Sequence, residues 1–200
     1  MRLFRREPPG PAEVFGRAAD REHRSGGGVQ TWSDPVPADG ALVAVTEALL
    51  EPGAVDHWAV APGVDVLTWV VAGELTHEDG VRAVPAFAGA LLHGSCDEPG
   101  HGDRNAGGAP LRLVRIALRR RGAPLPTCGP TRAPVLVPGS GAVEVLTRRT
   151  ELEATAMHLH VVDGAFSVAG TPLRPGDSVQ LFTTRTLDGE GIALAWVGRQ

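Results

Sequence analysis

Short apolar runs separated by turn residues constrain the fold of this chain more than any other feature. Residues 41–50 and 64–72 are dense in valine, leucine or tryptophan, and the turn sequences PADG, EPG and APG flank them. Further runs of this kind cover 111–118, 142–148 and 154–162. Strands that recur at intervals of about 8–12 residues are typical of barrels and sandwiches. The sequence therefore predicts an all-β protein.

The glycine and proline content agrees with this prediction. The 26 glycine and 17 proline residues are spread along the chain without a period, which suits short strands joined by turns better than long helices. Residues 162–184 alternate apolar and polar side chains between turns, and we expect a β-meander there. A single helix is expected, over residues 11–23 (PAEVFGRAADREH).

Residues 119–141 divide the chain. This segment holds five proline and four glycine residues, too many for a helix or a central strand. We expect a linker packed across two β-domains, each large enough for a core of its own. The N-terminal domain is predicted over 1–118 and the smaller C-terminal domain over 142–200, where strands from the linker complete it.

Charge and apolar content exclude several classes of function. The net charge of −4 gives no general attraction to nucleic acid. No apolar stretch reaches the ~18 residues of a membrane span, and the N-terminus lacks the apolar segment of a signal peptide. The two cysteines, Cys96 and Cys128, match no metal-site spacing and suit a reducing compartment. We expect a cytoplasmic monomer that binds neither nucleic acid nor membranes.

Two segments carry a resemblance to a known family. Residues 63–80, GVDVLTWVVAGELTHEDG, resemble the pirin pattern GFETVTYVLEGELEHxDS without a gap, and 161–181, VVDGAFSVAGTPLRPGDSVQL, resemble the second half of the same proteins. Residues 24–34 and 111–126 also fall where pirins carry related sequences. The resemblance implies a bicupin, which consists of two cupin-type β-barrels with little helix.

The resemblance also bears on metal binding. Active pirins hold one iron-like metal in the N-terminal barrel and cleave flavonols such as quercetin with dioxygen, whereas other members act as regulators. The two histidines of the family's HPH motif fall on Ala59 and Ala61, and the glutamate that follows falls on Asp65. The second ligand pair falls on His101 and Asp103. Because alanine cannot coordinate a metal, we predict that no metal or other cofactor is bound.

A substitute ligand set is the alternative. His101 and Asp103 would need a third ligand, either His57 or His93, to hold one iron or similar divalent ion. His57 precedes Ala59 by two positions, a displacement of about 6.5 Å, whereas metal sites tolerate about 0.2 Å. His101 and Asp103 are either pocket residues or a polar pair in a glycine-rich loop. The predicted binding-pocket residues are His57, Asp65, His93, His101 and Asp103.

Other polar residues have plainer interpretations. His77 stands at a predicted strand end and is interpreted as structural. His158 and His160 share one face of a predicted strand, but no third ligand lies near them in the sequence, so a structural role is favoured. Arg115 and the arginines at 119–121 form either a basic rim for an anionic ligand or a solvated face.

Two hypotheses from different classes follow. The first is a pirin-like bicupin that has lost its metal and binds a small molecule or a protein partner in a regulatory role. The second is a quercetinase-like dioxygenase with the altered ligand set, in which the metal orients flavonol and dioxygen together. Since the fold alone does not decide function, the geometry of the site has to separate them.

Overall fold

The computed structural model describes nine stretches of the chain, which are 13–34, 40–59, 61–78, 82–95, 101–120, 128–131, 135–137, 141–153 and 157–198. The chain forms two compact units. The N-terminal unit is Arg17–Glu144, and the C-terminal unit combines Met1–Gly16 with Val145–Gln200. Most of the predicted linker at 119–141, and residues 96–100, which include Cys96, lie outside the described residues.

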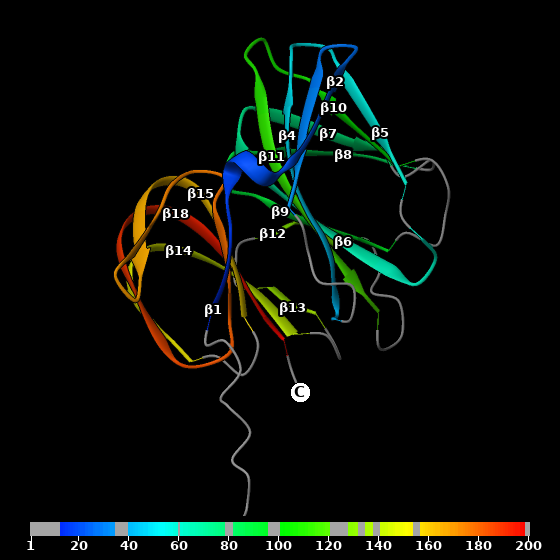
Figure 1. The fold of residues 1–200 in the computed structure, drawn as a ribbon. Coiled ribbons are helices and arrows are strands. Elements are labelled where there is room, and N and C mark those ends of the chain that lie inside the picture. The colour runs from blue at the N-terminus through cyan, green and yellow to red at the C-terminus, as the bar shows by residue number, and fades with distance from the viewer. Residues whose placement is uncertain are drawn as a thin grey trace, which may run out of the picture. The chain divides into compact units, whose positions relative to one another are not determined.

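The N-terminal unit contains two antiparallel sheets (Figure 1). The larger sheet has the order β12-β9-β6-β11-β4-β3-β2, and the smaller has the order β5-β10-β7-β8. The strands of the larger sheet are β2 (Glu22–Gly26), β3 (Val29–Ser33), β4 (Leu42–Leu50), β6 (Val64–Ala72), β9 (Leu91–Ser95), β11 (Leu111–Arg119) and β12 (Cys128–Thr131). Those of the smaller sheet are β5 (Val55–Trp58), β7 (Glu74–Glu78), β8 (Ala83–Phe87) and β10 (His101–Asn105).

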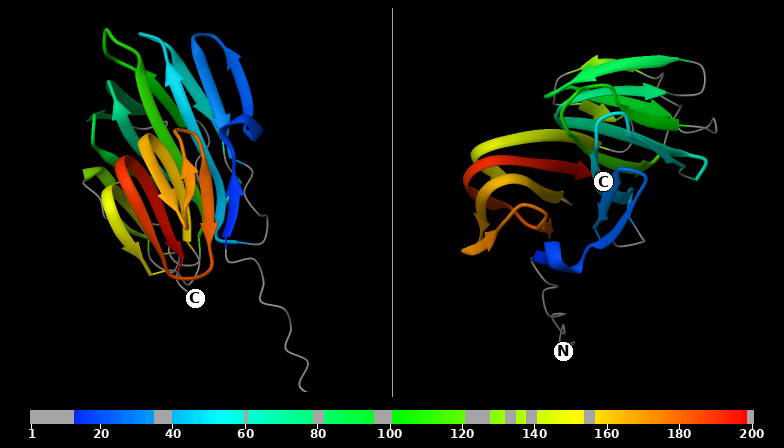
Figure 2. Two further views of the ribbon diagram at one scale, coloured as in Figure 1. Left: turned by 60° about the vertical axis from the view of Figure 1, so that its left-hand side comes forward. Right: turned by 90° about the horizontal axis from the view of Figure 1, so that it is seen from above.

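The third sheet has the order β1-β17-β15-β18-β14-β13, with β16 paired to β15. Its strands are β1 (Glu13–Gly16), β13 (Val135–Val137), β14 (Gly141–Leu152), β15 (Met157–Val168), β16 (Thr171–Leu173), β17 (Ser178–Leu181) and β18 (Arg185–Gly198). The long strands β14, β15 and β18 curve strongly (Figure 2). The sheet includes β1 because Glu13–Gly16 pairs with β17.

The all-β prediction is confirmed, and one local prediction is wrong. The helix expected over 11–23 is replaced, in its described part, by β1, the short 3₁₀ turn η1 (Ala18–Asp20) and the start of β2. Gly16 lies so close to the neighbouring strand that an added Cβ would stand 2.6 Å from Ser178 Oγ. Pairing with β17 thus outweighs a weak helical preference, as tertiary contacts commonly do.

Three strands of the larger sheet, β4, β6 and β11, lie where the sequence predicts strands. The predicted run 64–72 is β6 to the residue, and Gly73 follows it with a φ of 93°. A side chain at Gly73 would also meet the backbone of Leu111 at 2.9 Å. Glycine is required there because it adopts positive φ without strain and leaves room for β11.

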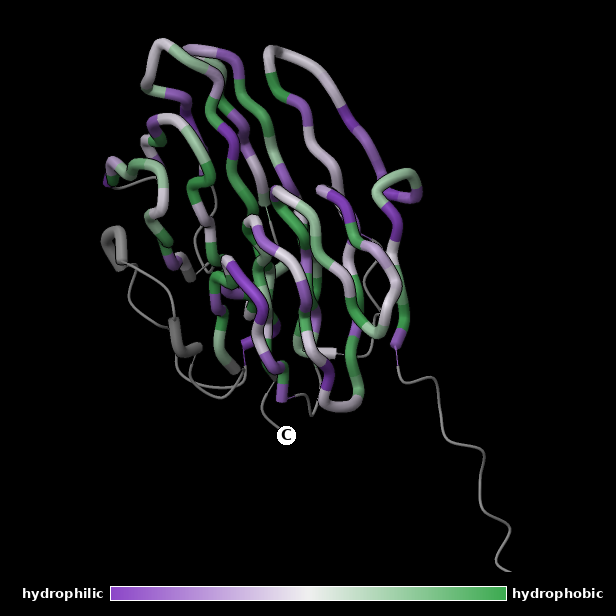
Figure 3. The backbone as a smooth tube through the Cα atoms, turned by 90° about the vertical axis from the view of Figure 1, so that its left-hand side faces the viewer, coloured by the Kyte–Doolittle hydropathy of each residue, from purple (hydrophilic) through white to green (hydrophobic). Residues whose placement is uncertain are grey.

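Hydropathy alternates along the strands (Figure 3). In the larger sheet of the N-terminal unit, one face, termed the inner face, carries the core residues Ala48, Val70 and Leu113, which occupy paired positions on β4, β6 and β11. Residues two positions along each strand share this face. None of the described residues forms a helix long and apolar enough to cross a membrane.

Candidate ligand-binding site in the N-terminal unit

Asp103 is the centre of a buried polar cluster on the smaller sheet. It lies in β10 with no exposed surface, opposite Asp56 of β5 and His77 of β7. His101 lies two residues earlier, opposite Trp58. Because directly paired residues of antiparallel strands project from the same face, all five side chains share one side of the sheet. The interpretation of His101 and Asp103 as a pair in a glycine-rich loop is therefore wrong, since both stand in a strand.

Both carboxylate oxygens of Asp103 have partners. Oδ1 lies 2.8 Å from Nδ1 of His77. Oδ2 accepts hydrogen bonds from Nε1 of Trp58 at 2.9 Å and from Nε of Arg115 at 2.8 Å. Nη2 of Arg115 stands 2.7 Å from the same oxygen. This carboxylate is satisfied entirely by side chains of the protein.

Arg115 connects the two sheets of the N-terminal unit. It belongs to β11 on the inner face of the larger sheet, is buried, and donates from Nη1 to Oδ2 of Asp56 at 2.6 Å. Its guanidinium also lies 5.2 Å from the ring centroid of Trp58, within cation–π distance. The interpretation of Arg115 as part of a solvated face is wrong, because its side chain is buried. The signal that could have identified it is the alternation of β11, in which Arg115 is the one charged residue among the inward positions Leu111, Leu113, Arg115 and Ala117.

The electrostatics of Asp103 favour its ionised form. Burial by itself raises the pKa of the carboxyl, but the charge of Arg115 and the hydrogen bond with His77 outweigh this effect and hold the pKa below its usual value. Asp103 and Arg115 therefore form a buried ion pair at neutral pH.

Three aromatic rings pack beside this pair. Trp58 stacks on His101 with centroids 5.0 Å apart, and His77 stacks on His101 at 5.6 Å. The stack holds Trp58 where its N–H reaches Asp103. Trp58 and Asp56 were not identified from the sequence, and His77, interpreted there as structural, is a direct partner of Asp103.

His57 does not join the cluster. Its partner in β10 is Gly102, so strand alternation places it on the opposite face of β5 from Asp56 and Trp58. It is exposed, and its ring lies beside Gly102. It cannot supply a third ligand beside His101 and Asp103.

Asp65 and His93 lie elsewhere again. Asp65 neighbours the inner-face residue Val66, and His93 neighbours the inner-face Gly94, so both project from the outer face of the larger sheet. Nε2 of His93 stands 3.9 Å from Asp65, and Arg120 donates to Asp65 at 2.9 Å. Two of the five predicted pocket residues, His101 and Asp103, thus come together, and the other three do not join them.

The donor set does not fit a catalytic metal. Among the described residues, no group of three His, Cys, Asp or Glu side chains could hold one. Asp103 already has Arg115 at 2.7 Å, and a cation at that carboxylate would meet the positive guanidinium.

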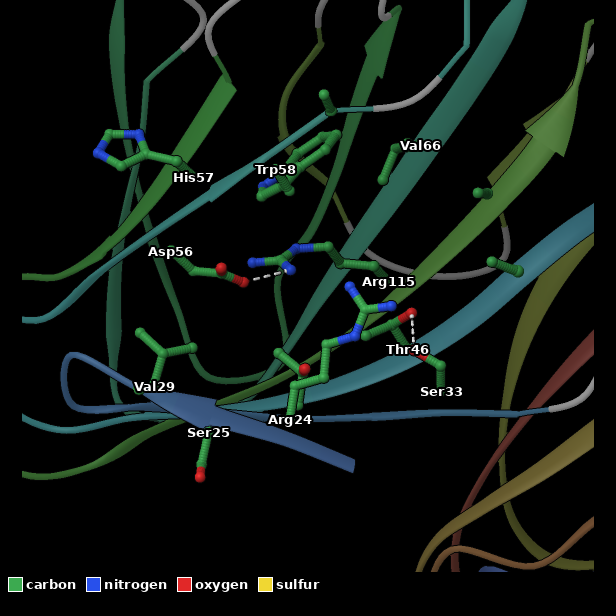
Figure 4. A pocket seen from close by; sticks show the side chains of 15 residues that line it. Arg24, Ser25, Val29, Ser33, Thr46, Asp56, His57, Trp58, Val66 and Arg115 are labelled. Carbon is green, nitrogen blue, oxygen red and sulfur yellow. Dashed lines mark hydrogen bonds and ion pairs between the residues drawn. The ribbon is translucent and has the colours of Figure 1, made fainter. Parts of the chain in front are cut away.

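An open pocket of about 530 Å³ adjoins the cluster (Figure 4). Asp56, Trp58 and Arg115 line one side of it, and Arg24 projects into it from β2. The inner face of the larger sheet forms another wall, with the hydroxyls of Ser33 and Thr46 and the apolar side chains of Val29, Ala44, Val66 and Ala117. Of the five predicted pocket residues, His57 is the one among the residues that line this pocket. The volume is within the range of small-molecule sites, about 300–1,000 Å³.

The C-terminal unit has no comparable cluster among its described residues. Leu159 and Val161 of β15 lie in the apolar core, so the alternate residues His158 and His160 project from the opposite face of the strand. Both histidines are buried. Their side chains therefore point away from the apolar core of this unit.

Comparisons with known proteins agree with this architecture. No protein-family model matches the chain, and no curated protein matches its sequence. Among solved structures, the chain is similar to the nickel complex of the bacterial pirin YhhW from Escherichia coli, with a TM-score of 0.73 and 15% identity over 94% of this chain and 100% of that one.

Two further structures show the same architecture. The putative glyoxylate-induced protein from Pseudomonas aeruginosa has a TM-score of 0.72 and 15% identity over 100% of this chain and 93% of that one. Ylba from Escherichia coli, of the DUF861 family, has a TM-score of 0.71 and 11% identity over 98% and 94%. The chain therefore has a bicupin fold, like that of pirin and related proteins. At such low identity the likeness concerns the fold alone.

Proposed function

We propose that this chain is a divergent pirin-like bicupin that binds a small organic molecule in its N-terminal barrel without a metal, in a cytoplasmic sensing or regulatory role. A protein partner would recognise the ligand-bound form of the chain. The observation that carries the proposal is the complete engagement of Asp103 by Arg115, Trp58 and His77 beside an open pocket.

The ion pair supports a binding site that needs no metal. A buried carboxylate needs a compensating cation and hydrogen bonds. Arg115 supplies the cation from within the chain, and it also connects Asp103 to Asp56. Because the buried charge of Asp103 is paired and ordered by side chains of the protein, this arrangement can form one wall of a binding site without an added ion. An oxygenase would need a metal that this donor set does not accommodate.

The proposal is tested by blocking the pocket. Ala44 lines it, whereas Val43, the preceding residue of β4, is 41% exposed and lies on the other face of that strand. Ala44→Phe should fill the space, and Val43→Phe is the matched control. A library of small molecules is screened by ligand-observed NMR in the presence of EDTA, with elemental analysis of the same protein.

The expected result is a set of ligands that bind the wild type and Val43→Phe but not Ala44→Phe, with metal far below one equivalent. Binding that is abolished by EDTA, or stoichiometric metal in the purified protein, would contradict the proposal. A library without any ligand that distinguishes the two variants would also count against it.

A further inference from the structure

We infer that the ligand carries a carboxylate on an apolar body and that Arg24 is the residue that binds this carboxylate. The inference rests on the proposed function and names the ligand class for the same pocket. It follows from the unequal neutralisation of the two arginines that line the pocket.

Arg115 is held by fixed, buried partners. Asp103 has no exposed surface, and Asp56 accepts a hydrogen bond from Nη1 of Arg115 at 2.6 Å. Two carboxylates of the protein therefore face the single positive charge of this arginine, which leaves no net positive charge for a ligand. Breaking either contact for a ligand would leave a buried charge without its partner, at a high free-energy cost.

Arg24 is held only by an exposed neighbour on its own strand. Nε and Nη2 of Arg24 donate to Oε1 of Glu22 at 2.9 and 2.6 Å, and the two side chains are 77% and 63% exposed. Such surface pairs contribute about 0–1 kcal/mol. An anion that enters the pocket can therefore replace Glu22 with little cost.

The guanidinium of Arg24 projects into the pocket between the hydroxyls of the β3–β4 wall and Arg115 (Figure 4). Oγ of Ser33 and Oγ1 of Thr46 lie 3.1 Å apart, so one hydroxyl donates to the other. The hydroxyl that accepts keeps its own proton for another acceptor. A carboxylate oxygen near Arg24 would receive a charge-assisted hydrogen bond from the arginine and a second bond from this hydroxyl.

The rest of the wall suits an apolar body. Val29, Ala44, Val66 and Ala117 present small apolar side chains on the same inner face. Contact with this wall would bury apolar ligand surface, while the carboxylate stays at the arginine side of the pocket. Fused-ring carboxylates of naphthoate size combine these two features.

The test compares 2-naphthoate with 2-naphthamide, its neutral isostere, by isothermal titration of the full chain. We expect the wild type to prefer naphthoate by about tenfold, as one charge-assisted hydrogen bond implies. Arg24→Gln should remove this preference, and Arg24→Lys should restore part of it. Arg104→Gln is the matched control, because Arg104 makes an equivalent exposed pair with Glu78 on β7.

Equal affinity of the wild type for the two probes, or no binding of either, overturns the inference about the carboxylate. An unchanged preference in Arg24→Gln overturns the role of Arg24. The proposed function fails separately, when the Ala44→Phe and Val43→Phe variants bind the same ligands as the wild type. The two failures are therefore distinguishable.

Discussion

The interiors of the two units differ in composition. The interior of the C-terminal unit is a continuous apolar cluster built around Leu159, Phe166, Leu181 and Leu187. The N-terminal unit has a smaller apolar cluster around Leu50 and Leu113. It also contains the buried ion pair of Asp103 and Arg115. An open pocket adjoins this ion pair. Among the described residues, the polar cluster beside an open pocket is therefore a feature of the N-terminal unit.

The first prediction concerns the ion pair itself. Arg115→Leu leaves Asp103 buried without its cation, and we expect the free energy of unfolding to fall by about 3–5 kcal/mol. Urea denaturation measures this loss. Arg149→Leu is the control from the C-terminal unit, because Arg149 and Asp188 form an exposed pair that contributes about 0–1 kcal/mol.

The double variant Arg115→Leu/Asp103→Leu separates the cost of an unpaired buried charge from the loss of the ion pair itself. Removing both charges should recover part of the loss, because no buried charge remains unpaired at that position. An Arg115→Leu protein as stable as Arg149→Leu would mean that the pair contributes no more than a surface contact.

The second prediction addresses the apolar barrel. Leu159→Ala removes a fully buried side chain from the C-terminal core, and we expect a loss of about 2–5 kcal/mol. Binding of 2-naphthoate should be unchanged in the folded variant. A large change in affinity at constant fold would show that the C-terminal core contributes to the pocket.

The third prediction concerns pH. Because the pKa of Asp103 is lower in the folded state than in an ordinary carboxyl, its ionisation stabilises the fold above the ordinary value of about 3.9. This contribution is lost as the pH falls through the lower, folded pKa. Urea midpoints between pH 7 and pH 3 should therefore decline in the wild type.

The matched variants separate this effect from a general loss of stability. Arg115→Leu/Asp103→Leu should show a shallower decline, because the titrating carboxyl is absent. Leu159→Ala should follow the wild-type slope at lower midpoints. Equal slopes in all three proteins would assign the acid sensitivity to other groups.

The smallest effect is expected at His57. It is exposed and lies on the opposite face of β5 from Trp58. His57→Ala should change the free energy of unfolding by no more than about 0.5 kcal/mol, with unchanged metal content. A drop in bound metal in this variant would support the alternative metal site in which His57 is a ligand.

Strand β6 was predictable because apolar runs and turn chemistry are local, whereas β10 was not, because its sequence resembles a glycine-rich loop. The run 64–72 and the glycine at position 73 specify β6 and the turn after it through propensity and backbone conformation alone. The segment 11–23 failed because the pairing of β1 with β17 joins Glu13 to Leu181, across most of the chain. No local pattern contains that contact.

The site also has one part that the sequence shows and one part that depends on the packing of the sheets. The sequence shows alanines at 59 and 61 and retains His101 and Asp103, and strand geometry places residues two apart on one face. Which face is buried depends on the packing of the sheets. This packing brought Asp56 and Arg115 together across 59 residues of sequence and turned Asp65 and His93 to the outer face. The physical reason is that a side chain's burial and charge partners depend on the strand opposite it, which the sequence of one strand does not contain.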